Sequence, residues 1–159
     1  MRRNISVFQA RKRKVSDQGQ GLLVYSMIDL NSHADTIVCG SNCIVMHLRG
    51  KEYDVAPHTD AYETIKAVPI VWAATAYHNP ETGETIILIL NEAICMGESM
   101  DHTLVNPKQL HAYGMTFQDN PFAEASVFIA TEDREFILPL SFKGTILGVA
   151  TRTSTDKEL

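Results

Sequence analysis

Two long apolar segments on either side of a dense turn constrain the fold of this chain more than any other feature. Residues 68–77 and 85–90 are rich in Val, Ile, Ala and Thr, and the segment between them, HNPETGE, contains Asn, Pro and Gly. Branched side chains favour strands, whereas Asn, Pro and Gly favour chain reversal. The pattern predicts a β-hairpin, which needs further strands to cover its apolar side chains.

Shorter segments of the same character precede and follow this hairpin. They end at clusters of small, polar or charged residues that favour turns. Strands are predicted at residues 22–30, 36–39, 43–48, 52–56, 126–130, 135–140 and 145–151, with turns at 40–42, 49–51 and 131–134. We expect Met46, Trp72, Ile87 and Ile89 to lie in the core that the strands enclose.

One helix is predicted, over residues 106–113. Asn106 is a good N-cap, Pro107 fits the first helical position, where its missing N–H costs nothing, and Gly114 suits the C-terminal end. A mostly-β chain with one short helix favours a closed or folded-over barrel. With 159 residues, the chain is long enough for one domain with a substantial core.

The basic residues are concentrated at the start of the sequence. Six of the 14 Lys and Arg residues precede Asp17, which is the first of the 19 acidic residues. We therefore expect residues 1–20 to form a flexible basic flank and the remainder to be strongly acidic. Because that acidic body repels phosphates, only weak nucleic-acid binding through the flank is expected. No apolar run is long enough to predict a membrane span.

The three cysteines, Cys39, Cys43 and Cys95, form no disulfide framework, which favours a reducing intracellular compartment. A zinc site is an alternative reading of Cys39 and Cys43, with His33, His47 or His58 as the further ligands. The spacing matches no standard zinc motif, and buried free cysteines are common. No metal site is therefore predicted.

The segment most suggestive of chemistry is MIDLNSHADT, residues 27–36, a strand that runs into a turn of small and polar residues. Aspartic proteases hold two carboxylates at such a turn, where they share one proton and activate a water molecule. Asn, Ser and Asp also favour turns that carry no chemistry. The segment alone leaves both readings open.

Residues 30–36 resemble the Asp-Thr/Ser-Gly-Ala motif of retropepsins, and are more similar still to the Leu-Asp-Ser-His-Ala-Asp-Thr form of retrotransposon polyproteins. In this comparison Asn31 stands at the aspartate, Ser32 is the hydroxyl residue and His33 replaces the usual glycine. The resemblance makes Asn31, Ser32 and His33 the catalytic positions and Ala34 and Asp35 the substrate-binding positions. An amide cannot share a proton as a carboxylic acid does, so the resemblance implies a protease that is inactive as written.

The resemblance covers roughly residues 22–120. Residues 68–90 are similar to the central hairpin region of retropepsins, part of which forms the flap, and residues 102–114 are similar to the loop and helix that close the fold. The implied fold is all-β, a retropepsin-like closed barrel with one short helix over residues 21–120. Residues 121–159 have no counterpart and are expected to be a C-terminal extension of extra strands.

The implied function is processing of a retroelement polyprotein, the chain's own, in the cytoplasm or within a retroelement particle. Since the chain carries one motif and a proton-sharing pair needs two, the implied unit is a homodimer. Asp35 would then accept hydrogen bonds across the dimer, with Arg49, Arg134 and Arg152 as candidate donors. Water is the nucleophile, so no cofactor is implied. The alternative is a non-catalytic β-barrel module for dimerisation or peptide binding.

Overall fold

A computed structural model of the protein describes residues 8–13, 23–57 and 59–159. Most of this part of the chain is β-structure, and α1 (Pro107–Ala112) is its one helix. The strands are β1 (Phe8–Arg13), β2 (Tyr25–Leu30), β3 (Val38–Gly40), β4 (Ile44–Val55), β5 (Ile65–His78), β6 (Thr85–Gly97), β7 (Thr103–Val105), β8 (Met115–Gln118), β9 (Phe128–Thr131), β10 (Ile137–Pro139), β11 (Ser141–Lys143) and β12 (Ile146–Arg152). The predicted mostly-β chain with one short helix is confirmed for the described residues.

Nine strands form one sheet in the order β1-β6-β3-β7-β2-β12-β5-β4, with β11 paired to β12. Since β5 also pairs with β6, the strands from β6 through β2 and β12 to β5 make a ring. The ring is uneven, because β12 and β5 meet at a single register pair, Arg152 with Ala76. An evenly closed barrel is therefore not confirmed.

The predicted hairpin is confirmed as β5 and β6, which run antiparallel on both sides of residues 79–84. Asn79 N–H donates to Glu84 O at 2.8 Å, and Gly83 has a φ of 70°. A left-handed conformation of this kind favours glycine. Both strands are longer than predicted. The added residues of β5 pair with β4, and the added residues of β6 pair with β3.

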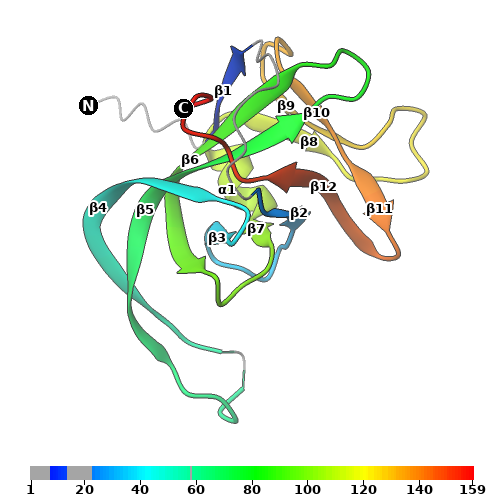
Figure 1. The fold of residues 1–159 in the computed structure, drawn as a ribbon. Coiled ribbons are helices and arrows are strands. Elements are labelled where there is room, and N and C mark those ends of the chain that lie inside the picture. Colours follow the sequence, from blue (N-terminus) through cyan, green and yellow to red (C-terminus); the bar gives the residue numbers. More distant parts are fainter. Residues whose placement is uncertain (1–7, 14–22, 58) are drawn as a thin grey trace, which may run out of the picture.

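The tight turn predicted at residues 49–51 is wrong. Strand β4 runs straight through it, and the register with β5 shifts between Leu48, opposite Val71, and Glu52, opposite Pro69. The extra residues form a bulge in which Gly50 adopts a φ of 69°. Pro69 has no N–H, so a bulge beside it sacrifices little pairing. The result is a long curved arm, β4 with β5, that extends away from the rest of the molecule (Figure 1).

The main core joins strands that are far apart in the sequence, from β2 to β12. Ile28 of β2, Leu110 of α1 and Ile129 of β9 are fully buried in it, together with Leu138 of β10. Strands β8, β9 and β10 form a separate three-stranded sheet, whereas β12 pairs with β2 in the large one. The strands that follow residue 121 thus share their core with the strand that leads into the candidate site.

The core prediction is correct for Ile87 and Ile89 but wrong for Trp72 and Met46, which are 36% and 40% exposed. The Arg49 guanidinium lies 4.9 Å from the centre of the Trp72 ring, and the His47 ring lies 5.8 Å from it. A cation over an indole face is stabilising at an exposed site. The Trp72 ring therefore supports the arm from outside the core.

Within the flank that was expected to be flexible, Phe8–Arg13 pairs with β6 as β1. The rest of residues 1–20 lies outside the described part of the chain. In the residues that the structure describes, no helix has the length and apolar character needed to cross a membrane.

Candidate functional site

The segment singled out in the sequence forms a turn between β2 and β3. Asn31 N–H donates to Val105 O at 3.0 Å, and the Asn31 side-chain Oδ1 accepts from His33 N–H at 2.9 Å. Asn closes its own backbone into a turn in this way because its side chain mimics a peptide carbonyl. A carboxylate at position 31 could accept the same bond.

The turn is fixed to the start of helix α1. The Asn106 side chain is 5% exposed and its Nδ2 donates to Ala34 O, while its Oδ1 accepts from Lys108 N–H at 2.7 Å. Gln109 Oε1 accepts from Thr36 Oγ1 at 3.1 Å and from Ile37 N–H at 2.7 Å. The N-cap residue and one side chain of the helix therefore hold the middle and the C-terminal end of the turn.

Strand pairing explains why the turn and the helix meet. Strand β2 runs parallel to β7, with Leu30 opposite Val105. The residues that follow both strands consequently emerge at the same edge of the sheet. Asn31 begins the turn there and Asn106 begins the helix, although they are far apart in the sequence.

Asn106→Ala should lower the free energy of unfolding by about 1–2 kcal/mol, because the helix loses its N-cap. Asn106→Asp keeps the capping oxygen but removes the Nδ2 donor to Ala34, so it should destabilise less while loosening the turn. Urea unfolding gives the stability of both variants, and amide hydrogen exchange at residues 33–37 reports the turn. Equal protection of the turn in Asn106→Asp and in the unsubstituted protein would contradict its attachment through Asn106.

A cleft of about 680 Å³ lies between the turn and the arm. Asn31, His33, Ala34 and Asp35 line it, whereas Ser32 is exposed and is not part of its wall. The opposite wall comes from β4, and the base comes largely from β6. The wall residues that sequence analysis missed include Lys51, Tyr53, Asp54, Val55, Ile70, Glu92, Ile94, Met96 and Met100.

Asp29 lies near the end of β2, two residues before the turn, but it does not line the cleft. Its Oδ2 lies 3.6 Å from His102 Nε2, and its Oδ1 is buried without a hydrogen-bond partner. A Cβ at Gly148 would lie 2.9 Å from that Oδ1, so the oxygen faces the β12 backbone. Burial raises the pKa of Asp29, and His102 partly opposes the shift. Asp29 is therefore directed into the sheet rather than at a bound substrate.

The chemistry available at the turn follows from these positions. The amide of Asn31 can donate and accept hydrogen bonds but cannot take a proton from water at neutral pH. Asp35 lines the cleft as an exposed carboxylate. Asn31 and Asp35 thus suit the binding of a polar backbone, whereas position 31 lacks the base that an aspartic protease requires.

The residues considered for zinc do not form one site. His33 lines the cleft, whereas Cys39 is 1% exposed within the main core, and His58 lies outside the described residues. Across the described part of the chain, no group of three or more His, Cys, Asp or Glu side chains could hold a metal ion.

Comparison with known proteins adds no relative. No family model, no curated protein and no solved structure matches this chain. The geometry of the turn and the cleft, and the resemblance of residues 30–36 to the retropepsin motif, are the features that bear on function.

Proposed function

We propose that the chain is a retropepsin-like aspartic endopeptidase domain of a retroelement polyprotein. It is inactive in this form because Asn31 stands at the catalytic aspartate position. One observation carries the proposal: the turn over residues 31–36 is held rigidly by helix α1 and lies on the wall of a cleft opposite a long β-arm. Such an arrangement suits the binding of an extended peptide between the turn and the arm. The mostly-β fold, with its uneven ring of strands, is the scaffold that we propose to be retropepsin-like.

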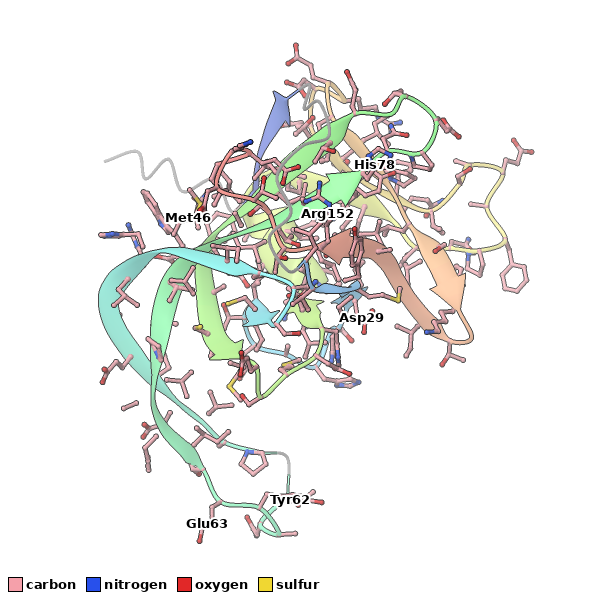
Figure 2. All side chains as sticks on the ribbon, viewed as in Figure 1. Asp29, Met46, Tyr62, Glu63, His78 and Arg152 are labelled. Carbon is pink, nitrogen blue, oxygen red and sulfur yellow. The ribbon has the colours of Figure 1, made fainter. Side chains whose placement is uncertain are left out.

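The arm formed by β4 and β5 is the best candidate for the flap. Lys51, Tyr53 and Val55 of β4 line the cleft opposite the turn. Tyr62 and Glu63 lie at the far tip of the arm, well away from Asp29 in the body (Figure 2). We therefore assign the flap to the exposed part of the arm, residues 45–54 and 65–67, rather than to the β5–β6 hairpin, whose strands are mostly buried.

The active form of the proposed enzyme is a homodimer, because each chain supplies one turn and the reaction needs a pair. Of the candidate donors to Asp35, Arg152 is already paired with Glu158 at 2.6 Å within the chain. Arg49 and Arg134 lie over the rings of Trp72 and Phe128 near the surface. Arg49 also lies 4.0 Å from Glu92, which leaves Arg134 as the first candidate for a bond across the dimer.

Sedimentation should show a dimer at micromolar concentration, with an interface of at least about 2,000 Å² in total. Asp35→Ala should raise the dissociation constant about tenfold while leaving the monomer folded, because Asp35 is exposed in the single chain. Asp60→Ala, on the exposed arm tip, is the matched control. A folded protein that stays monomeric at all concentrations would exclude the dimeric site.

Restoring the carboxylate tests the proposed function directly. Asn31→Asp should cleave peptides that span the junctions flanking this domain, and Asn31→Ala should not. The absence of cleavage by a dimeric Asn31→Asp protein would exclude the protease.

The second candidate, a non-catalytic peptide-binding module, is supported by the edge strand. Strand β4 lies at the end of the large sheet, so one side of its backbone is available to an added strand. This candidate requires that the unsubstituted protein bind extended peptides. It also requires that the Asn31→Asp protein bind them without cleavage.

A further inference from the structure

Strands β11 and β12 form a hairpin whose tip is not covered by the rest of the described chain. Lys143 of β11 is the register partner of Ile146 of β12, which leaves a loop of two residues, and Gly144 in that loop has a φ of 64°. A two-residue loop that begins with a left-handed glycine holds two strands closely together. Residues 141–146 are nevertheless all exposed, so a well-defined hairpin extends into solvent.

The exposed surface of this hairpin is largely apolar. Phe142 is 42% exposed and Ile146 is 49% exposed, although both are large apolar side chains. Among the described strands, β11 pairs only with β12, so the backbone groups along its second edge have no strand partner. Exposed apolar side chains beside an open strand edge favour contact with another protein.

The hairpin lies on the side of the candidate turn that is away from the cleft. Strand β2 leads into the turn, and its two neighbours in the sheet are β7 and β12. The cleft extends over β7, β3 and β6, through Leu104, Val38 and Ile94, whereas none of the described residues of β11 and β12 lines it. Figure 1 shows the arm and this hairpin on opposite sides of the molecule.

The start of β12 reaches the level of the turn. Pairing between β12 and β2 ends where Gly148 lies opposite Asp29, and β12 begins two residues before Gly148, at Ile146. The same antiparallel register, when continued, sets Ile146 opposite Asn31. An exposed apolar side chain therefore flanks the candidate catalytic position on the side where the single chain supplies no cleft wall.

Charge indicates the kind of partner that fits this surface. From Asp17 onward the chain has 19 acidic and 8 basic residues, so two copies repel each other over most of their surfaces. A two-fold interface brings the same patch of both copies together, and like charges within it are unfavourable. Residues 141–148 contain no acidic side chain, and Lys143 is their single charge, opposite in sign to the body. A second copy can approach here without repulsion between carboxylates.

We propose that the hairpin of residues 141–148 is the surface on which a second copy of this chain docks, around a two-fold axis beside Asn31. The inference rests on the proposed function, because the site needs a second turn and the hairpin lies on the side where that turn has room. The exposed Phe142 and Ile146 side chains of both copies become buried in this dimer. The two clefts then lie on the outer sides of the paired turns.

Amide hydrogen exchange locates the surface without any substitution. Exchange of the unsubstituted protein is compared at nanomolar and at micromolar concentration. Residues 141–147 should exchange more slowly at the higher concentration, whereas residues 119–124, an exposed loop, should not change. A dimer that protects other segments but not the hairpin would overturn the proposal, and so would a protein that stays monomeric throughout.

Ile146→Asp should raise the dissociation constant of the dimer at least about thirtyfold, because both copies then bring a carboxylate into the buried patch. Ile137→Asp is the matched control, since Ile137 is 48% exposed on β10 of the small sheet. Sedimentation measures both variants, and circular dichroism checks their folding. Equally tight dimers of the two variants would contradict the docking surface. If Ile146→Asp does not fold, hydrogen exchange of the unsubstituted protein decides the question.

A combined variant separates this inference from the proposed function. Asn31→Asp should cleave the junction peptide, and adding Ile146→Asp to it should abolish cleavage at concentrations where the dimer dissociates. Undiminished cleavage by the combined variant would overturn the docking surface and leave the protease in place. A dimer that protects residues 141–147 but does not cleave as Asn31→Asp would support the surface and exclude the protease.

Discussion

Asn31→Asp is expected to give a protease at least about a thousand times more active than the unsubstituted chain, because two carboxylates that share a proton supply both the base and the acid. The turn already makes the backbone hydrogen bond that an aspartate at position 31 would accept. His33 N–H already donates to the side-chain oxygen of residue 31, Asn31 N–H donates to Val105 O, and Asn106 and Gln109 hold the backbone that follows, at Ala34 and Ile37. A carboxylate at position 31 should therefore fit the turn without a rearrangement.

The measurement is cleavage of a fluorogenic junction peptide between pH 3 and pH 8. Repulsion between the paired carboxylates raises one of their two pKa values, so activity should fall once both are ionised at higher pH. A statine-type transition-state analogue should inhibit the variant. Inhibitor-sensitive cleavage by the unsubstituted protein would contradict the assignment of Asn31, and would transfer the catalytic role to Asp35 or Asp29.

Glu158→Gln is expected to lower the free energy of unfolding by about 3 kcal/mol, since it leaves a largely buried Arg152 without its ionic partner. The side chains of Arg152 and Glu158 are 14% and 3% exposed, and they meet through two hydrogen bonds, at 2.6 and 2.9 Å. Glu158 Oε2 also accepts from Thr155 N–H at 2.8 Å. Figure 2 shows Arg152 near the middle of the molecule, where the last residues fold back on the sheet.

Acid titration separates the ion pair from a packing effect. Hydrogen bonds from Arg152 hold the pKa of Glu158 below its ordinary value of 4.5. The stabilisation is therefore complete above pH 4.5 and is lost as the pH falls through the lowered value. The stability difference between the unsubstituted protein and Glu158→Gln should shrink over that range. Asp156→Asn, an exposed control, should change stability by less than about 0.5 kcal/mol at any pH. A difference that does not vary with pH would contradict the ionic role.

Local chemistry made part of the structure predictable from the sequence. The turn at residues 78–84 and the ends of helix α1 depend on Asn, Pro and Gly, whose preferences arise within a few residues of the chain. The turn over residues 31–36 was predicted for the same reason. Four of its five proposed site residues line the cleft, and Ser32 does not.

The remainder depends on contacts between distant segments. Residues 49–51 carry a turn-like sequence, yet pairing with β5 absorbs them as a bulge. Trp72 lies on an apolar segment, but its ring packs against Arg49 and His47 of β4 rather than in the core, so it stays partly exposed. The cleft wall at Lys51 and Glu92 arises where the arm and β6 face the turn. No short-range pattern contains that information.

The position of β2 between β7 and β12 fixes the order in which the site can mature during synthesis. Val24 N–H donates to Thr153 Oγ1, a partner 129 residues further along the chain. Closing so large a loop is slow, and non-local strand pairing delays folding. One edge of β2, the strand that leads to Asn31, therefore has no pairing partner until β12 leaves the ribosome. A nascent chain halted before β12 should hold the turn but expose that edge to chaperones and to neighbouring chains.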